Sequence, residues 1–254
     1  MLSCAVVLFR RLPWDRLGLL VAASLVMGVG ITLLVRARLG LVPMDVAHIG
    51  VARRFGWTLG GGIIATQSFL LITMTFLRIP VGIGTVLAFA VPAVTADVLL
   101  SVLPDITTLA WRIVALTTGG VACCVGVPAY LLADLGRMPR DGIMLALAAG
   151  RSGGHAGRAP PSPWRTACAR VGIDLTFVLA GGLLLGPGNA VRSGAVGVAT
   201  LVLACGSGPL VAWLLDQFAG MSWIHSGHIH GSGQDRPVRA KEQNEALGNE
   251  VPGG

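Results

Sequence analysis

The sequence contains very little charge. Only 12% of its 254 residues are Asp, Glu, Lys or Arg, whereas an average globular domain has about 25%. Hydrophobic residues make up 54% of the chain, and the mean hydropathy is +0.75. A water-soluble chain of this length could not cover so much apolar surface with so few polar residues. The composition therefore predicts an all-α, polytopic membrane protein.

Signatures of catalysis are also scarce. The chain has no complete P-loop, no strand-bounded dinucleotide fingerprint and no nucleophile motif, and its five cysteines lack the paired spacing of metal ligands. His225, His228 and His230 could chelate a metal ion, but a short histidine cluster in a polar tail is weak evidence for a site. We therefore expect no enzyme activity, no cofactor and no metal.

Long uncharged segments are present instead. A bilayer core about 30 Å thick needs roughly 20 helical residues to cross it. Six segments come close to this length: 17–35, 55–77, 79–103, 113–133, 175–191 and 193–215. We predict six transmembrane helices in a single domain over residues 17–218. A leader, 1–16, precedes this domain, and a flexible cytoplasmic tail, 219–254, follows it.

A short motif occurs twice. Residues 39–45, Leu-Gly-Leu-Val-Pro-Met-Asp, return 96 residues later as 135–141, Leu-Gly-Arg-Met-Pro-Arg-Asp, each time after a long apolar segment. A weaker match pairs 82–86 with 195–199 at an offset of 113, and the linker 151–165 absorbs the difference. The halves, about 17–104 and 112–218, would each hold three spans. An odd number makes them face opposite ways, which is the 3+3 inverted-repeat plan of many secondary transporters.

The motif itself predicts the start of a helix. Pro43 and Pro139 suit the first helical position, and the aspartate two residues later complements the positive end of the helix dipole. The following segments, 41–52 and 139–150, are too short for ordinary crossings and suit re-entrant or interfacial helices. In the simpler interpretation these residues only begin two helices.

The alternative interpretation is functional. If both helix starts lie inside the protein, their backbone donors and nearby polar side chains could coordinate an ion or a polar solute. The side chains concerned are Asp45, His48, Arg140 and Asp141.

Asp97 interrupts the third apolar segment. A carboxylate within a span costs about 2.5–3.5 kcal/mol on insertion scales and usually faces a partner or a cavity. Asp97 is therefore a candidate carrier of a coupling proton. The alternative is a salt bridge or hydrogen bond to a neighbouring helix.

The distribution of basic residues predicts the orientation. The net charge is +7, and six spans with the N-terminus inside place 13 Arg and Lys residues on one side and 6 on the other. Cytoplasmic loops carry the excess of basic residues, so we expect both termini in the cytoplasm. The basic face would attract anionic lipid headgroups rather than nucleic acid.

Three stretches of the chain are similar to a known family. Residues 39–48, 82–86 and 134–142 resemble the bacterial YczE/YitT-like integral membrane proteins, and the likeness covers about 17–218. The resemblance implies a multi-pass protein of the bacterial plasma membrane and supplies no substrate. Two hypotheses remain: a small secondary transporter for a solute or proton, and a scaffold or regulator that acts through its basic cytoplasmic surface. Either could form a homo-oligomer.

Overall fold

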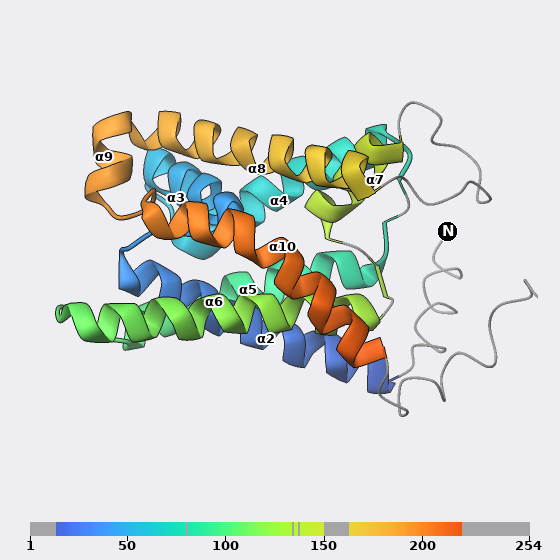
Figure 1. Ribbon diagram of the computed structural model, residues 1–254, viewed down its shortest axis with the longest axis horizontal. Helices are drawn as coiled ribbons and strands as arrows, with labels where there is room; N and C mark the ends of the chain where they lie inside the picture. Colours follow the sequence, from blue (N-terminus) through green and yellow to red (C-terminus); the bar gives the residue numbers. More distant parts are fainter. Residues whose placement is uncertain (1–13, 80, 134, 137, 150–162, 220–254) are drawn as a thin grey trace, which may run out of the picture. The chain divides into compact units, whose positions relative to one another are not determined.

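The computed structural model describes residues 14–79, 81–133, 135–136, 138–149 and 163–219. The chain divides into two units, Met1–Leu215 and Asp216–Gly254, and the second is described only as far as Ala219. The described residues form helices and contain no strand (Figure 1). The helices are α2 (Trp14–Ala37), α3 (Pro43–Phe55), α4 (Leu59–Phe76), α5 (Ile83–Val102), α6 (Leu109–Leu132), α7 (Pro139–Ala149), α8 (Pro163–Leu185), α9 (Pro187–Arg192) and α10 (Val198–Ala219).

Five of these helices are long and apolar enough to cross a membrane. They are α2, α4, α5, α6 and the Cys168–Leu185 part of α8, and α10 adds the shorter apolar helix Val198–Gly208. Large apolar side chains such as Phe69, Phe76 and Leu183 are exposed on their surfaces. Hydrocarbon solvates such side chains, so the structure confirms a polytopic helical membrane protein in contact with the lipid bilayer.

Several boundaries differ from the predicted ones. Helix α2 begins at Trp14, inside the segment 1–16 that the sequence predicts as a leader, and α8 begins at Pro163, inside the predicted linker 151–165. The fifth span ends at Leu185 instead of residue 191, because Gly186 has a φ of 81° and Pro187 starts a new helix. The rest of the predicted leader, most of the linker, the tail from residue 220 and its histidine cluster lie outside the described residues.

The helices form two groups that α4 connects. Helix α2 packs against α5 and α6, whereas α3 and α7 each pack against both α4 and α8. Helix α4 also contacts α5. Figure 1 shows α2, α5 and α6 running alongside one another, with α3 and α8 in the other group. The two short motif helices, α3 and α7, therefore belong to the same group.

Helices α2 and α6 cross at glycines and run antiparallel. Gly30 lies so close to α6 that an added Cβ would be 2.7 Å from Cys123 Sγ, and an added Cβ at Gly126 would be closer still to Met27 Cγ of α2. Position 27 thus faces 126 and position 30 faces 123, so the two helices run in opposite directions. Gly126 lies 96 residues after Gly30, and Cys123 lies 96 residues after Met27. The two contacts are therefore related by the motif spacing.

Each motif docks on the first turn of a helix from the other half. Gly40 lies against Thr200 at the start of α10, and Gly136 lies against Thr85 at the start of α5. Their φ angles are 138° and 139°, which side chains with a Cβ rarely adopt. A Cβ would also be 2.6 Å from Thr200 N in the first case and 2.7 Å from Thr85 Oγ1 in the second. Both positions therefore require glycine.

The receiving elements share a Gly-x-x-Thr pattern. The Gly82 amide donates to Thr85 Oγ1 at 3.3 Å, and the Gly197 amide donates to Thr200 Oγ1 at 3.2 Å. These pairs are 115 residues apart, which is two residues more than the offset of 113 in the sequence match. The offsets differ because the sequence match aligns small apolar residues, whereas the glycine-to-threonine hydrogen bond fixes the position of each helix start.

We expect Gly136→Ala to destabilise the protein by about 2 kcal/mol or more, because alanine there combines an unfavourable φ with a steric clash. The matched control is Gly18→Ala, since Gly18 is helical and has nothing within 4 Å of the added methyl group. Thermal unfolding of the purified proteins in detergent measures the difference. Equal melting temperatures for the two variants would contradict the role of Gly136.

Candidate functional site

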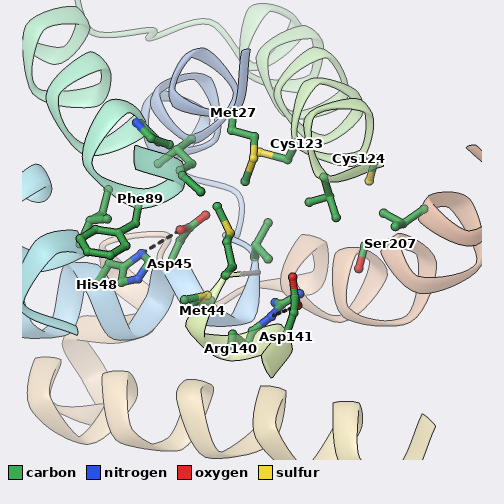
Figure 2. A pocket seen from close by; sticks show the side chains of 18 of the residues that line it. Met27, Met44, Asp45, His48, Phe89, Cys123, Cys124, Arg140, Asp141 and Ser207 are labelled. Carbon is green, nitrogen blue, oxygen red and sulfur yellow. Dashed lines mark hydrogen bonds and ion pairs between the residues drawn. The ribbon is translucent and has the colours of Figure 1, made fainter. Parts of the chain in front are cut away.

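A cavity lies where the two helix groups meet. Its volume is about 90 Å³, and a water molecule needs about 10–15 Å³ measured in this way. The cavity can therefore hold several waters or the polar part of a small solute. Its walls come from α2, α3, α4, α5, α6, α7, α8 and α10. Figure 2 shows Asp45 and His48 on one side and Arg140 and Asp141 on another.

The first turns of both motif helices line this cavity. Pro43 is the first residue of α3 and Pro139 the first of α7, and both are fully buried. The next residues, Met44 and Asp45 in α3 and Arg140 and Asp141 in α7, face the cavity. Asp45 and Asp141 thus complement the positive ends of their own helices while remaining available to a ligand.

Asp45 and His48 form a buried pair on one turn of α3. The distance between His48 Nδ1 and Asp45 Oδ1 is 3.0 Å, and His48 is 3% exposed. When Nδ1–H donates to the carboxylate, Nε2 becomes an acceptor. Within the described part of the chain, His48 Nε2 has no hydrogen-bond partner.

Gln67 of α4 adds a second unpartnered acceptor. Its Nε2 is 3.9 Å from Met44 Sδ, a weak contact, and its Oε1 has no partner among the described residues. Both Gln67 and His48 line the cavity. A buried polar atom left unpaired costs about 1–3 kcal/mol. This side of the cavity is therefore suited to a group that donates hydrogen bonds.

Charged residues from α7 and α8 make the other side. Arg140 Nε is 3.4 Å from Asp141 Oδ1, and Arg140 Nη1 is 3.5 Å from Asp174 Oδ1. The Tyr130 hydroxyl donates to Asp141 Oδ2. These groups are largely removed from solvent, where charge pairs interact more strongly than in water. The pairs therefore hold Arg140 and Asp141 in place.

Arg170 extends this cluster toward α10. Its Nε is 4.0 Å from Asp174 Oδ2, and its Nη2 donates to Ser207 Oγ at 3.0 Å. Arg170 and Ser207 both line the cavity. Helix α8 is thereby connected to α10 through polar side chains.

Two contacts of α4 and α8 are related by a fixed spacing. Met74 of α4 packs on Gly142 of α7, and Gly181 of α8 packs on Val46 of α3. Val46 and Gly142 are 96 residues apart, which is the motif spacing, and Met74 and Gly181 are 107 residues apart.

Two pairs of residues at these spacings differ in chemistry. Met44 contacts Gln67, and Arg140 contacts Asp174. The offsets of 96 and 107 relate these two pairs to each other. The first pair is neutral, and the second pair is charged.

The site carries an excess of negative charge. The carboxylates of Asp45, Asp141 and Asp174 are matched by the guanidinium groups of Arg140 and Arg170 alone. With His48 neutral, one negative charge is left over. A proton on His48 or a cationic group in the cavity would balance it.

Four of the predicted site residues come together, and one does not. Asp45, His48, Arg140 and Asp141 line the same cavity, whereas Asp97 is not among its lining residues. Asp97 Oδ1 accepts a hydrogen bond from the Gly60 amide at 2.7 Å, at the start of α4. The structure thus places Asp97 as a partner for a helix N-terminus.

Other polar residues of the site were missed. The predicted fifth span begins at residue 175, so that Asp174 lies at its edge and Arg170 lies outside it, on the predicted cytoplasmic side. Helix α8 contains both. Gln67 could have been predicted from the sequence, because its amide lies in the middle of the uncharged segment 55–77. Among the residues that the structure describes, no three His, Cys, Asp or Glu side chains group closely enough to hold a metal ion.

We expect Asp174→Asn to lower the stability by about 3 kcal/mol, because it leaves two largely buried guanidinium groups short of a countercharge. The double variant Arg140→Met with Asp174→Gln copies the Met44 and Gln67 pair and should recover much of this loss. Thermal unfolding in detergent measures both. A double variant less stable than Asp174→Asn would contradict the equivalence of the two pairs.

Comparison with known proteins places the chain in a family. Residues 14–216 match a family described as a family of unknown function, DUF6198. The chain is 27% identical over 198 residues to the uncharacterized membrane protein YczE of Bacillus subtilis, covering 77% of this chain and 83% of the relative. It is 24% identical over 219 residues to an uncharacterized protein of Haemophilus influenzae, covering 83% and 88% respectively.

No solved structure matches the chain significantly. The match to the family extends from the first residue of α2 to within α10 and includes every residue of the cavity. The similarity to YczE also agrees with the resemblance found in the sequence. The chain therefore belongs to the DUF6198 family of YczE-like membrane proteins.

Proposed function

We propose that the protein is a small secondary transporter of the bacterial plasma membrane whose solute pathway passes through the central cavity. The observation that carries the proposal is the meeting of both motif helices, at Asp45 and Asp141, in one buried cavity with unpartnered acceptors. Polar groups at such a depth are costly in a membrane protein and usually mark a pathway for an ion or solute. Helix starts directed at a central site are also typical of transporters.

We propose further that the two halves form an inverted repeat. The antiparallel packing of α2 and α6 supports this, because helices related by the motif spacing run in opposite directions. The docking of each motif on the other half supports it as well. On this proposal α3 and α7 are re-entrant helices, both termini are cytoplasmic, and the substrate site lies at the interface of the repeats.

The coupling ion that fits the site best is a proton on the Asp45–His48 pair. Histidine is a common proton carrier in proteins. Its protonation would remove the excess negative charge of the site, and its loss would restore that charge. A solute bearing positive charge would then compete with the proton, as antiport requires.

The alternatives have less support. A scaffold acting through a basic cytoplasmic surface depends on the linker 151–165, most of which lies outside the described residues. Two of the arginines assigned to that surface, Arg140 and Arg170, line the cavity instead. We propose no catalytic activity, because the cavity residues suit binding and proton exchange.

Single cysteines at positions 14 and 110 test the inverted arrangement. Trp14→Cys and Ala110→Cys lie 96 residues apart at the exposed starts of α2 and α6, in a background without the native cysteines. We expect a membrane-impermeant maleimide to label position 14 from the cytoplasmic side and position 110 from the outside. Labelling of both from the same side would rule out an inverted repeat.

Proton flux tests the transport proposal. We expect proteoliposomes with a trapped pH dye to show flux that Asp45→Asn reduces about tenfold or more, because the variant removes the carboxylate of the proposed proton-carrying pair. Asp97→Asn should retain flux, since an asparagine at 97 can still accept from Gly60. Loss of flux only in Asp97→Asn would favour the original assignment of the coupling proton to Asp97. Absence of flux from the wild-type protein would count against proton coupling.

A further inference from the structure

An apolar groove runs between α6 and α10. Its volume is about 530 Å³, and Leu116, Val121, Val198, Val202 and Leu210 are among its lining residues. Four of these side chains are exposed, and Leu116 is partly exposed. Both α6 and the apolar part of α10 are helices suited to the bilayer interior. The groove is therefore a place where hydrocarbon can lie against the protein.

The groove adjoins the polar cavity. The two spaces share four lining residues, Gly120, Cys124, Leu203 and Ser207. Ser207 also accepts the hydrogen bond from Arg170. A molecule lying across this boundary would have an apolar part between α6 and α10 and a polar part beside Asp45 and His48.

The equivalent seam in the other half is closed. Gly28 of α2 lies in tight contact with Pro92 and Thr95 of α5, so that a Cβ would be 2.6 Å from Thr95 Cβ. Cys124 lies 96 residues after Gly28, which is the motif spacing, and Ser207 lies 115 residues after Pro92. The glycine that allows close packing in one half is thus replaced by a larger residue at the mouth of the groove in the other.

We propose that the cavity and the groove together bind a single-chain alkylammonium amphiphile, with its chain between α6 and α10 and its ammonium head at Asp45. The inference rests on the proposed function and names the substrate class of that site. The head group matches the excess negative charge. It also supplies donors to His48 Nε2 and Gln67 Oε1, two acceptors of cavity-lining residues that have no hydrogen-bond partner among the described residues. The groove gives the chain a lateral route from the bilayer.

Photolabelling of the full-length protein in phosphatidylcholine nanodiscs tests this. The probe is a dodecylamine with a diazirine in the chain and a terminal alkyne, and mass spectrometry locates the label. We expect label on segments 116–124 and 198–210. Excess dodecylamine should compete for the site and reduce the labelling about tenfold. Propylamine and dodecanoate should not compete, because each lacks one part of the amphiphile.

Two pairs of variants provide the controls. Asp45→Asn should lower the labelling about tenfold. Asp105→Asn should leave it unchanged, because Asp105 is exposed in the segment between α5 and α6, where it pairs with Arg36 of α2. Gly120→Leu should block the groove, where an added Cβ is already 3.2 Å from Leu203 Cδ2. Gly172→Leu should have no effect, since that position is open. Monodisperse elution of each variant shows that it is folded.

The outcomes separate this inference from the transport proposal. Label spread equally over the exposed face of α4, without competition by dodecylamine, would overturn the inference even if proton flux is observed. Unchanged labelling in Asp45→Asn would also overturn it. Specific labelling of the groove together with absent proton flux would support the amphiphile site and contradict proton-coupled transport.

Discussion

The close crossing of α2 and α6 is the contact on which the rest of the structure depends. Glycines at 30 and 126 allow the two backbones to approach, and van der Waals packing between small residues is the main source of helix association within lipid. The contacts at this crossing make α2 and α6 antiparallel. The motif glycines then dock on helices of the opposite half. The short helices α3 and α7 consequently begin inside the protein rather than at its surface.

Burial of these helix starts explains why the cavity is polar. In hydrocarbon, backbone groups must find partners within the protein, and irregular backbone is tolerated only where protein covers it or a cavity hydrates it. The loops before α3 and α7 meet this requirement through hydrogen bonds to the other half, such as Leu41 N–H to Ala195 O at 3.2 Å and Gly84 N–H to Leu135 O at 3.2 Å. Asp45 and Asp141 can therefore face the cavity.

Positions related by the motif spacings carry different chemistry. Met44 and Gln67 correspond by spacing to Arg140 and Asp174. Gly28, which packs tightly on α5, corresponds by spacing to Cys124, which lines the apolar groove. The cavity thus has a charged side and a hydrogen-bonding side, and it shares lining residues with the groove. These features are the basis of the proposed amphiphile site.

Composition and apolar run length by themselves determined the membrane class and the helical fold, because these depend on the local match between side chains and solvent. The motif likewise indicated where α3 and α7 begin and which of their residues are polar. Tertiary structure decided which polar residues meet. It placed Asp97 at the start of α4 and moved Arg170 and Asp174 into a span, since a long-range partner can retain a charge that a hydropathy count excludes. It also showed that Gly82 and Gly197 make the same kind of contact, each with the threonine three residues later. Similarity of small residues in the sequence does not reveal such a contact.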